Sequence, residues 1–161
     1  MRRWSRCARM QKRRDDMLET STLYKYAEQS NATVMRSKLP VNGSLCIDTG
    51  EQSYYIGIDE NMREGSAEHR THLAHELGHC ATGSFYNRYA ACDVRQKHEN
   101  CADRWMIEHL VPEEELMDQL IQQRGQVWEL AEYFAVTEDL IKKALCWYLH
   151  GTLDTRLYYS N

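Results

Sequence analysis

The segment His75-Glu76-Leu77-Gly78-His79 constrains the fold of this chain more than any other feature, because its chemistry requires a helix. On an α-helix, residues four apart project from the same face, so His75 and His79 can bind one metal ion. Glu76 then lies beside that ion, where its carboxylate can act as a general base on a water molecule. Short HExxH matches also arise by chance on exposed helices, so these five residues alone do not decide the matter.

A second segment, twenty residues further on, can supply the third ligand that such a site needs. Glu99 and Asp103 are four residues apart, so they share one face of a helix that we expect over about 96–110. One carboxylate can bind zinc while the other accepts the outward N–H of a ligand histidine and fixes its tautomer. Acids at this spacing are usually only solvated. The two segments together nevertheless predict a catalytic zinc site.

The expected chemistry is peptide hydrolysis. Zinc lowers the pKa of its bound water toward 7, and Glu76 can take the proton as the water attacks a peptide carbonyl. Glu76 can later pass that proton to the leaving amine. The oxyanion formed in the attack needs a donor besides zinc, and Tyr86 is our candidate, with ordinary loop packing as the alternative. The remaining candidates between the two segments are Arg88, Tyr89 and Arg95.

His72 opens an alternative to this ligand set, because it lies on the same helix face one turn before His75. A site of three histidines would leave Glu76 without a metal-activated water, so we favour the carboxylate ligand. His72 is expected to pack near the site or to face the substrate groove. The ligand types favour zinc and leave manganese and iron as alternatives.

The composition indicates one soluble domain. The chain has 161 residues, of which 42% are apolar, and its mean hydropathy is −0.71. No stretch approaches the ~18 consecutive apolar residues of a membrane span, and the basic N-terminus lacks the apolar run of a secretory signal. Six scattered cysteines without a CxxC pair favour reduced thiols. We therefore expect a cytoplasmic protein that does not bind membranes.

The N-terminal segment Met1–Arg14 conceals an acidic body, because it carries seven basic residues and no acidic ones. The whole chain has 20 Lys and Arg against 24 Asp and Glu, so residues 15–161 hold 13 against 24, a net charge of −11. Such a charge is not typical of a phosphate-binding surface. Residues 1–16 are expected to be disordered or to precede the true start, at Met10 or Met17, and a binding arm is less favoured.

The pattern of the remaining chain predicts an α+β fold with a small three-stranded sheet. A helix is expected over 16–29, followed by short β-type runs at Val34-Met35, Leu45–Ile47 and Tyr54–Ile58. The turn signals lie at Asn42-Gly43 and Thr49-Gly50. The helix that carries both histidines is expected to begin after its cap, Ser66, and to end near Gly83. Further helices are expected over 96–110, 113–123, 126–134 and 138–149.

The C-terminal part has the rhythm of a helix-turn-helix, with Thr137 as the cap of its second helix. That helix starts with Glu138-Asp139, which would repel phosphate, and Lys142-Lys143 are a small counterweight. We therefore expect residues 17–125 to form a metallopeptidase core and 126–161 a helical pair packed on it or docking a substrate protein. The alternative is a DNA-binding or protein-binding regulatory module whose metal site is structural.

Three segments carry a family resemblance: HLAHELGHCATGSFYNRY, KHENCADRWMIEHLVP and VWELAEYFAVTEDLIKKAL. They resemble the ImmA/IrrE zinc metallopeptidases, and the resemblance extends from about residue 17 to 151. The plan of two helices with a later ExxxD segment is also similar to the thermolysin-like zinc peptidases. The resemblance implies a gluzincin-like α+β domain.

The same resemblance implies roles for individual residues. His75, His79 and Glu99 would bind zinc, Glu76 would be catalytic, and Asp103 would accept a hydrogen bond from a ligand histidine. It also implies a protein partner, a helix-turn-helix repressor encoded beside the peptidase on a phage or integrative element. Cleavage of that repressor would relieve repression, so the protein would act as an anti-repressor. Direct binding to nucleic acid is not expected.

Overall fold

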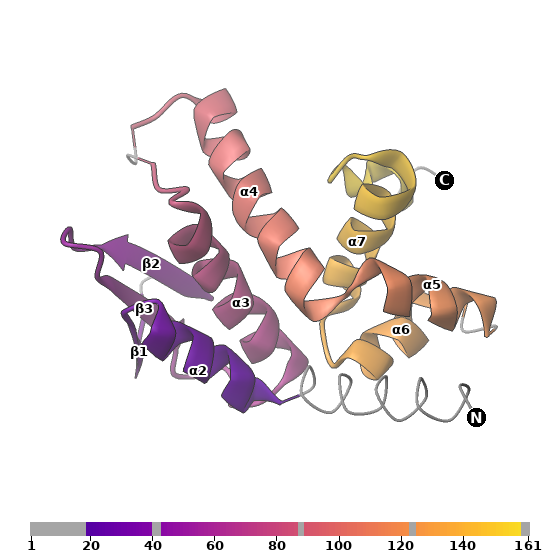
Figure 1. Cartoon of the computed structure of the whole chain (residues 1–161), viewed down its shortest axis with the longest axis horizontal. Helices are drawn as coiled ribbons and strands as arrows, with labels where there is room; N and C mark the ends of the chain where they lie inside the picture. The colour runs from indigo at the N-terminus through magenta and orange to yellow at the C-terminus, as the bar shows by residue number, and fades with distance from the viewer. Residues whose placement is uncertain (1–18, 40–42, 87–88, 123–124, 159–161) are drawn as a thin grey trace, which may run out of the picture.

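The computed structural model describes residues 19–39, 43–86, 89–122 and 125–158. The expected basic tail over 1–16, the alternative starts at Met10 and Met17, the turn residue Asn42 and the loop residue Arg88 lie outside these ranges. The described chain is an α+β structure in which a small sheet lies at one end and a group of helices at the other (Figure 1). Among these residues no helix is long and apolar enough to cross a membrane.

The sheet has three strands with the last one in the middle. Helix α2 (Thr20–Gln29) leads into β1 (Ala32–Ser37), and β2 (Ser44–Asp48) and β3 (Tyr54–Asp59) follow. The strand order is β1-β3-β2, with β1 parallel and β2 antiparallel to β3. The three expected strands are therefore confirmed.

The two expected turns have different outcomes. The Thr49-Gly50 turn closes the β2–β3 hairpin, where the Thr49 amide donates to the Ser53 carbonyl oxygen at 3.1 Å. Gly43 lies on the connection from β1 to β2, and this connection is no hairpin because β3 lies between these strands. Gly43 has a φ of +134°, which favours glycine. Because β3 is the central strand, β2 is an edge strand of the described sheet.

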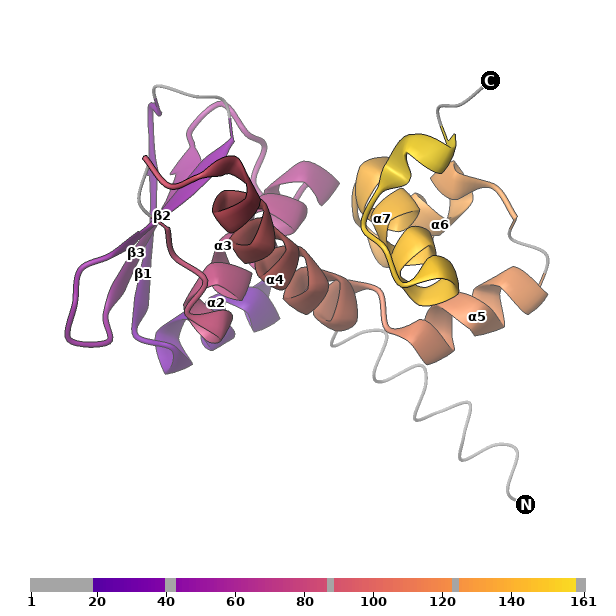
Figure 2. The same ribbon diagram turned by 90° about the horizontal axis from the view of Figure 1, so that it is seen from above.

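One face of the sheet packs against helices and the other is open. The side chains of Ile56 and Ile58 on β3 are fully buried, on the face covered by α2 and α3 (Ala67–Thr82) (Figure 2). Side chains alternate between the two faces along a strand, so the residues next to Ile56 and Ile58 and their partners on β1 and β2 point to the opposite face. There Met35, Ile47 and Tyr55 are exposed. The site is built on the covered side.

Helix α3 lies between the sheet and α4 (Cys92–Leu110) (Figures 1 and 2). Its expected limits are confirmed. The Ser66 hydroxyl accepts a hydrogen bond from the His69 amide at 3.2 Å, and Gly83 ends the helix in the left-handed conformation with a φ of 61°. Leu73 and Leu77 on this helix are fully buried, so α3 is a central element of the core.

Helix α4 (Cys92–Leu110) begins four residues earlier than expected and crosses α3 at very short range. A Cβ atom placed on Gly78 of α3 would lie 2.6 Å from the carbonyl oxygen of Ala102 on α4. Only glycine therefore permits this approach of the two backbones. Because Ala102 lies between Glu99 and Asp103 on α4, the close crossing brings both carboxylates against α3.

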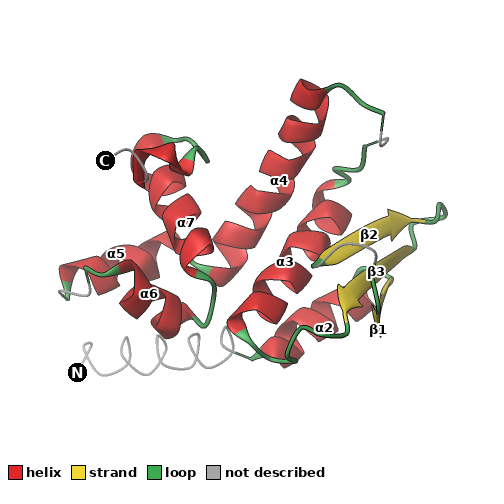
Figure 3. Cartoon of the chain, turned by 180° about the vertical axis from the view of Figure 1, so that it is seen from behind, coloured by secondary structure: helices red, strands yellow, loops and turns green. Residues whose placement is uncertain are grey.

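The described residues after α4 form helices joined by loops (Figure 3). These are α5 (Glu113–Ile121), α6 (Val127–Phe134), α7 (Glu138–His150) and the short 3-10 helix η1 (Thr155–Tyr158). Pro112 precedes α5 as its N-cap.

The turn between α6 and α7 is tied to the N-terminal half of α3. Arg70 Nε donates to the carbonyl oxygen of Ala135 at 3.0 Å, and the Thr137 amide donates to Thr71 Oγ1 at 3.3 Å. Thr137 also caps α7 as expected, because its hydroxyl accepts from the Leu140 amide at 3.3 Å. Buried residues of both C-terminal helices belong to the same hydrophobic core as α3 and α4.

Candidate active site

The structure brings the three expected metal ligands to one point. His75 Nε2 and His79 Nε2 on α3 lie 3.1 Å apart, as two residues four apart on one helix face should. Glu99 on α4 reaches both imidazoles, with its carboxylate oxygens 3.2 Å from His75 Nε2 and 3.6 Å from His79 Nε2. The ligand atoms of the three residues all lie within 4.8 Å of one another. Two imidazole nitrogens and one carboxylate are a donor set that fits a catalytic zinc ion.

The outer nitrogen of each imidazole is also held. His75 Nδ1 donates to Asp103 Oδ1 at 3.1 Å, and His79 Nδ1 donates to the carbonyl oxygen of Ser84 at 2.8 Å. These hydrogen bonds fix the tautomer in which both Nε2 atoms face the shared point. The structure therefore places Asp103 where the spacing of Glu99 and Asp103 predicts it. The Ser84 carbonyl was not anticipated; the left-handed turn at Gly83 directs it back toward α3.

The charges of the site are arranged around His75. Burial opposes its protonation, but hydrogen bonds to Asp103 and Glu99 outweigh that effect and raise the pKa of His75 to about 9. The hydrogen bond to His75 in turn lowers the pKa of Glu99 to about 2. At neutral pH the His75 ring is therefore a cation that contacts a carboxylate at each of its two nitrogens.

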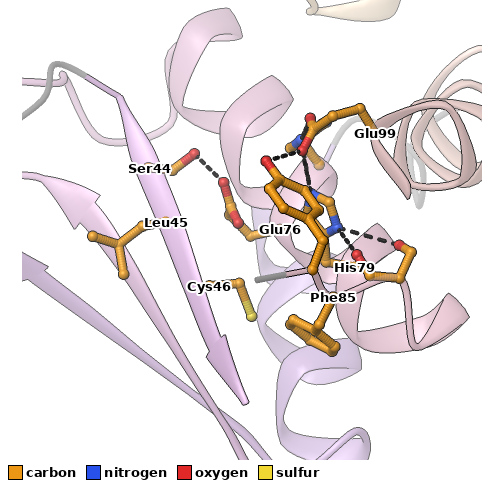
Figure 4. Close-up of a pocket in the computed structure, with 10 residues that line it drawn as sticks. Ser44, Leu45, Cys46, Glu76, His79, Phe85 and Glu99 are labelled. Atoms are coloured by element: carbon orange, nitrogen blue, oxygen red, sulfur yellow. Dashed lines mark hydrogen bonds and ion pairs between the residues drawn. The ribbon is translucent and has the colours of Figure 1, made fainter. Parts of the chain in front are cut away.

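Glu76 projects from α3 toward strand β2 rather than into the ligand cluster (Figure 4). It is buried, and Ser44 Oγ donates a hydrogen bond to its Oε1 at 2.6 Å. The same Ser44 oxygen lies 2.9 Å from His72 Nδ1, which can donate to it. A hydrogen bond to one oxygen of the Glu76 carboxylate leaves the other available as a proton acceptor.

His72 therefore contacts Ser44 and is not one of the candidate metal ligands. Burial lowers its pKa, so the ring is neutral at neutral pH. The metal-ligand group found among the described residues contains the carboxylate of Glu99 and not His72, which argues against the site of three histidines. Ser44 was missed in the sequence. The close approach of the preceding Gly43 to His72, where a Cβ would lie 3.0 Å from His72 Cε1, is seen only in the structure.

A cavity of about 440 Å³ opens onto the ligand cluster between β2, α3 and the start of α4 (Figure 4). Its walls are formed by Ser44, Leu45, Cys46, His75, Glu76, His79, Ser84, Phe85, Tyr86 and Glu99. The cavity combines the candidate ligands, the candidate base and an edge strand, so a peptide could meet all three at once.

Among the described members of the predicted oxyanion group, Tyr86, Tyr89 and Arg95, Tyr86 is the one that lines this cavity. Its hydroxyl donates to Glu99 Oε1 at 2.7 Å, and this hydrogen bond raises the pKa of Tyr86 to about 12. The phenol therefore keeps its proton at neutral pH and lies directly beside a ligand carboxylate. Tyr89 is 82% exposed and is not part of the cavity wall.

Helix α7 also reaches the site, through a lysine side chain. Lys143 on α7 places its Nζ 2.6 Å from Asp103 Oδ2. In the sequence Lys143 appeared only as a weak counterweight to the acids of the C-terminal pair. Its position at the site depends on the packing of α7 against α4, which no local pattern reveals.

Comparison with known proteins agrees with this geometry. A family model described as Peptidase_M78, IrrE N-terminal-like domain, matches residues 27–145. No curated protein and no solved structure matches the chain. The matched range covers well over half of the sequence, runs from α2 into α7, and contains every residue of the site. The chain therefore belongs to the Peptidase_M78 family, the metallopeptidases with an IrrE N-terminal-like domain, as its resemblance to ImmA/IrrE proteins predicts.

Proposed function

We propose that this protein is a zinc-dependent endopeptidase that cleaves a helix-turn-helix repressor and so relieves repression of a mobile element or of stress genes. The observation that carries the proposal is the meeting of His75, His79 and Glu99 at one cavity with Glu76 beside them. His75, His79 and Glu99 would hold the zinc ion. Family membership supports the reaction class, and the donor set supports zinc.

Each residue of the site has a part in hydrolysis. A bound zinc ion would supply Lewis-acid chemistry, lowering the pKa of water and polarising a peptide carbonyl. Glu76 accepts the proton of the attacking water and transfers it to the leaving amine. Ser44 holds one oxygen of Glu76, so the carboxylate keeps a fixed orientation during both transfers. Tyr86 can turn its hydroxyl from Glu99 toward the oxyanion of the substrate.

The form of the cavity supports an extended substrate. Strand β2 forms one wall, and within the described sheet its only partner strand is β3. Its second edge can pair with a peptide in the extended conformation, whose main chain would then run past the metal ligands. A segment that can adopt this conformation in a folded repressor is a linker or loop, not a helix of its DNA-binding domain.

Contacts of the C-terminal helical pair support the peptidase over the alternative of a DNA-binding module. The start of α7, which would have to enter the major groove, is bonded to α3 through Thr137 and Thr71. Lys143 is paired with Asp103, and Lys142 lies 3.3 Å from Asp139 Oδ1. These contacts oppose phosphate binding by the two lysines. We propose that the pair packs on the core as part of the enzyme.

The test is incubation of the zinc-loaded protein with the helix-turn-helix repressor encoded beside it. We expect the full-length repressor to disappear and two fragments to be found by mass spectrometry. Glu76→Gln should lower the cleavage rate by at least about 100-fold, because it removes the general base, and a chelator should abolish cleavage. The matched control is Glu68→Gln, an exposed glutamate in the first turn of the same helix, which should cleave at the wild-type rate.

Two results would contradict the proposal. One is a repressor that is cut equally fast by Glu76→Gln and by the wild type. The other is an intact repressor together with salt-dependent binding of this protein to operator DNA, which would favour the alternative.

A further inference from the structure

Lys143 contacts a buried carboxylate from a part of the chain that lies far from the motif in sequence. Its Nζ donates to Asp103 Oδ2 at 2.6 Å, a short distance that is typical of a charge-assisted hydrogen bond. The side chain of Asp103 is 7% exposed, whereas that of Lys143 is 35% exposed. The lysine therefore reaches in from the surface to a buried carboxylate whose other oxygen contacts His75.

The two oxygens of Asp103 have separate partners. Oδ1 accepts from His75 Nδ1 at 3.1 Å, and Oδ2 accepts from Lys143. A carboxylate is planar, so a group that fixes one oxygen also fixes the direction of the other. Lys143 thereby limits rotation of the Asp103 carboxylate, and the orientation of the His75 ring depends on that carboxylate.

We propose that Lys143 is a positioning residue of the metal site. By holding Asp103 Oδ2 it keeps Oδ1 against His75 Nδ1, so that His75 Nε2 points at the place shared with His79 and Glu99. The inference rests on the proposed function, because it concerns how tightly that site binds zinc. It makes α7, and with it the C-terminal helical pair, a contributor to the metal centre.

The place of Lys143 in the fold supports a positioning role. The α6–α7 turn is fixed to α3 by the Arg70–Ala135 and Thr137–Thr71 hydrogen bonds, which set where α7 begins. Lys143 also borders a cavity of about 310 Å³ whose wall includes His75, Glu76 and Asp103. This space adjoins the lysine, so the longer side chain of arginine can be accommodated there.

The test measures zinc affinity directly, by competition with a chromophoric chelator, and does not depend on cleavage. We expect Lys143→Met and Lys143→Gln each to bind zinc about 10-fold more weakly than the wild type, at the lower end of the loss that follows removal of a ligand histidine's own partner, which here is Asp103. Either folded variant decides the result, since neither carries the charge that pairs with Oδ2. Lys143→Arg should return to within about 3-fold of the wild type, because the guanidinium can hold the same oxygen.

The matched control is Lys142→Met on the same helix. It removes an equal charge, but Lys142 pairs with the exposed Asp139 rather than with the site, so zinc affinity should stay at the wild-type value. A double variant adds a second test. If Lys143 acts through Asp103, then adding Lys143→Met to Asp103→Asn should change zinc affinity by less than about 2-fold.

The outcomes separate the two proposals. Wild-type zinc affinity in the folded Lys143→Met and Lys143→Gln variants would overturn the positioning role while leaving the metal site intact. Independent, multiplying losses in the double variant would also overturn it, because Lys143 would then act by another route. A wild-type protein that binds no zinc would contradict the proposed function itself, and the positioning role with it.

Discussion

At the scale of single residues, the raised pKa of His75 has the largest effect on how this site would bind a metal ion. The His75 imidazolium lies between Glu99 and Asp103, which hold its pKa at about 9. Zinc binds only the neutral imidazole, so binding at pH 7 must expel a proton. The proton on His75 therefore competes with the zinc ion for the imidazole nitrogen.

This competition predicts a pH dependence of metal binding with a definite sign. Below pH 9 the protonated form dominates, so the apparent zinc affinity should rise by about tenfold for each pH unit between pH 6 and 8, and level off above pH 9. Titration calorimetry in two buffers of different ionisation enthalpy should show the release of close to one proton from this group at pH 7. Asp103→Asn removes one cause of the raised pKa and should release less. A zinc affinity that is constant from pH 6 to 8 would contradict this account.

The residues that could be predicted from the sequence are those whose relation is local. His75, Glu76 and His79 share one turn of a helix, and Glu99 and Asp103 share another, so helical geometry alone fixes each set. Ser44 and Lys143 could not be predicted, because a strand start and a C-terminal helix reach the site only through tertiary packing. Their individual residue types are common on any surface.

At the scale of elements, the crossing of α3 and α4 determines whether the site exists. Gly78, inside the HELGH segment, touches the backbone of Ala102 between the two carboxylates of α4. The sequence shows this glycine as a mild weakness in a helix. The structure explains why glycine stands here: a larger residue would push α4 away from α3 and so separate the histidines from Glu99.

Gly78→Ala tests the crossing. The added methyl group would lie 2.6 Å from a backbone oxygen, which no side-chain rotation can relieve. We expect the free energy of unfolding to fall by about 1–3 kcal/mol despite the better helix propensity of alanine, and zinc affinity to fall as α4 moves away. Gly125→Ala is the control, because a Cβ there meets nothing within 4 Å. Denaturant unfolding and chelator competition measure both effects; wild-type values for Gly78→Ala would show that the helices do not need this close contact.

The ends of a helix could be predicted from the sequence where a single residue caps the helix or ends it with a left-handed turn. Ser66 and Gly83 define α3 through a side-chain cap and a left-handed turn, and both limits are confirmed. The start of α4 was placed too late, because Ala91 offers no side-chain cap and the first turn is exposed. The order β1-β3-β2 could not be predicted, since turn residues show where a chain reverses but not which strand it joins.

At the scale of the whole molecule, the C-terminal helices and the metal site form one structure. Buried side chains of α6 and α7, including Leu130, Phe134 and Ile141, pack in the same core as Leu73 and Leu77 of α3. The family match also extends past residue 126, where we expected a helical pair to begin. A domain boundary near residue 125 remains a prediction, but separation of the pair would remove Lys143 from Asp103.

The arrangement also relates the acidic surface to the proposed partner. Outside its basic N-terminus the chain has a net charge of −11, which opposes DNA. A repressor presents a basic DNA-binding surface, and such a surface would be attracted rather than repelled. The net charge of the chain therefore favours contact with the proposed repressor over contact with the operator DNA.

The most direct test of the central claim, that His75, His79 and Glu99 form a catalytic metal centre, is the zinc content of the purified protein. Elemental analysis after loading with zinc and removal of the excess should find about one ion per wild-type chain and less than about a tenth of that in His75→Ala. His150→Ala, at the exposed end of α7, should keep the wild-type content. Equal zinc in the wild type and in His75→Ala would contradict the account.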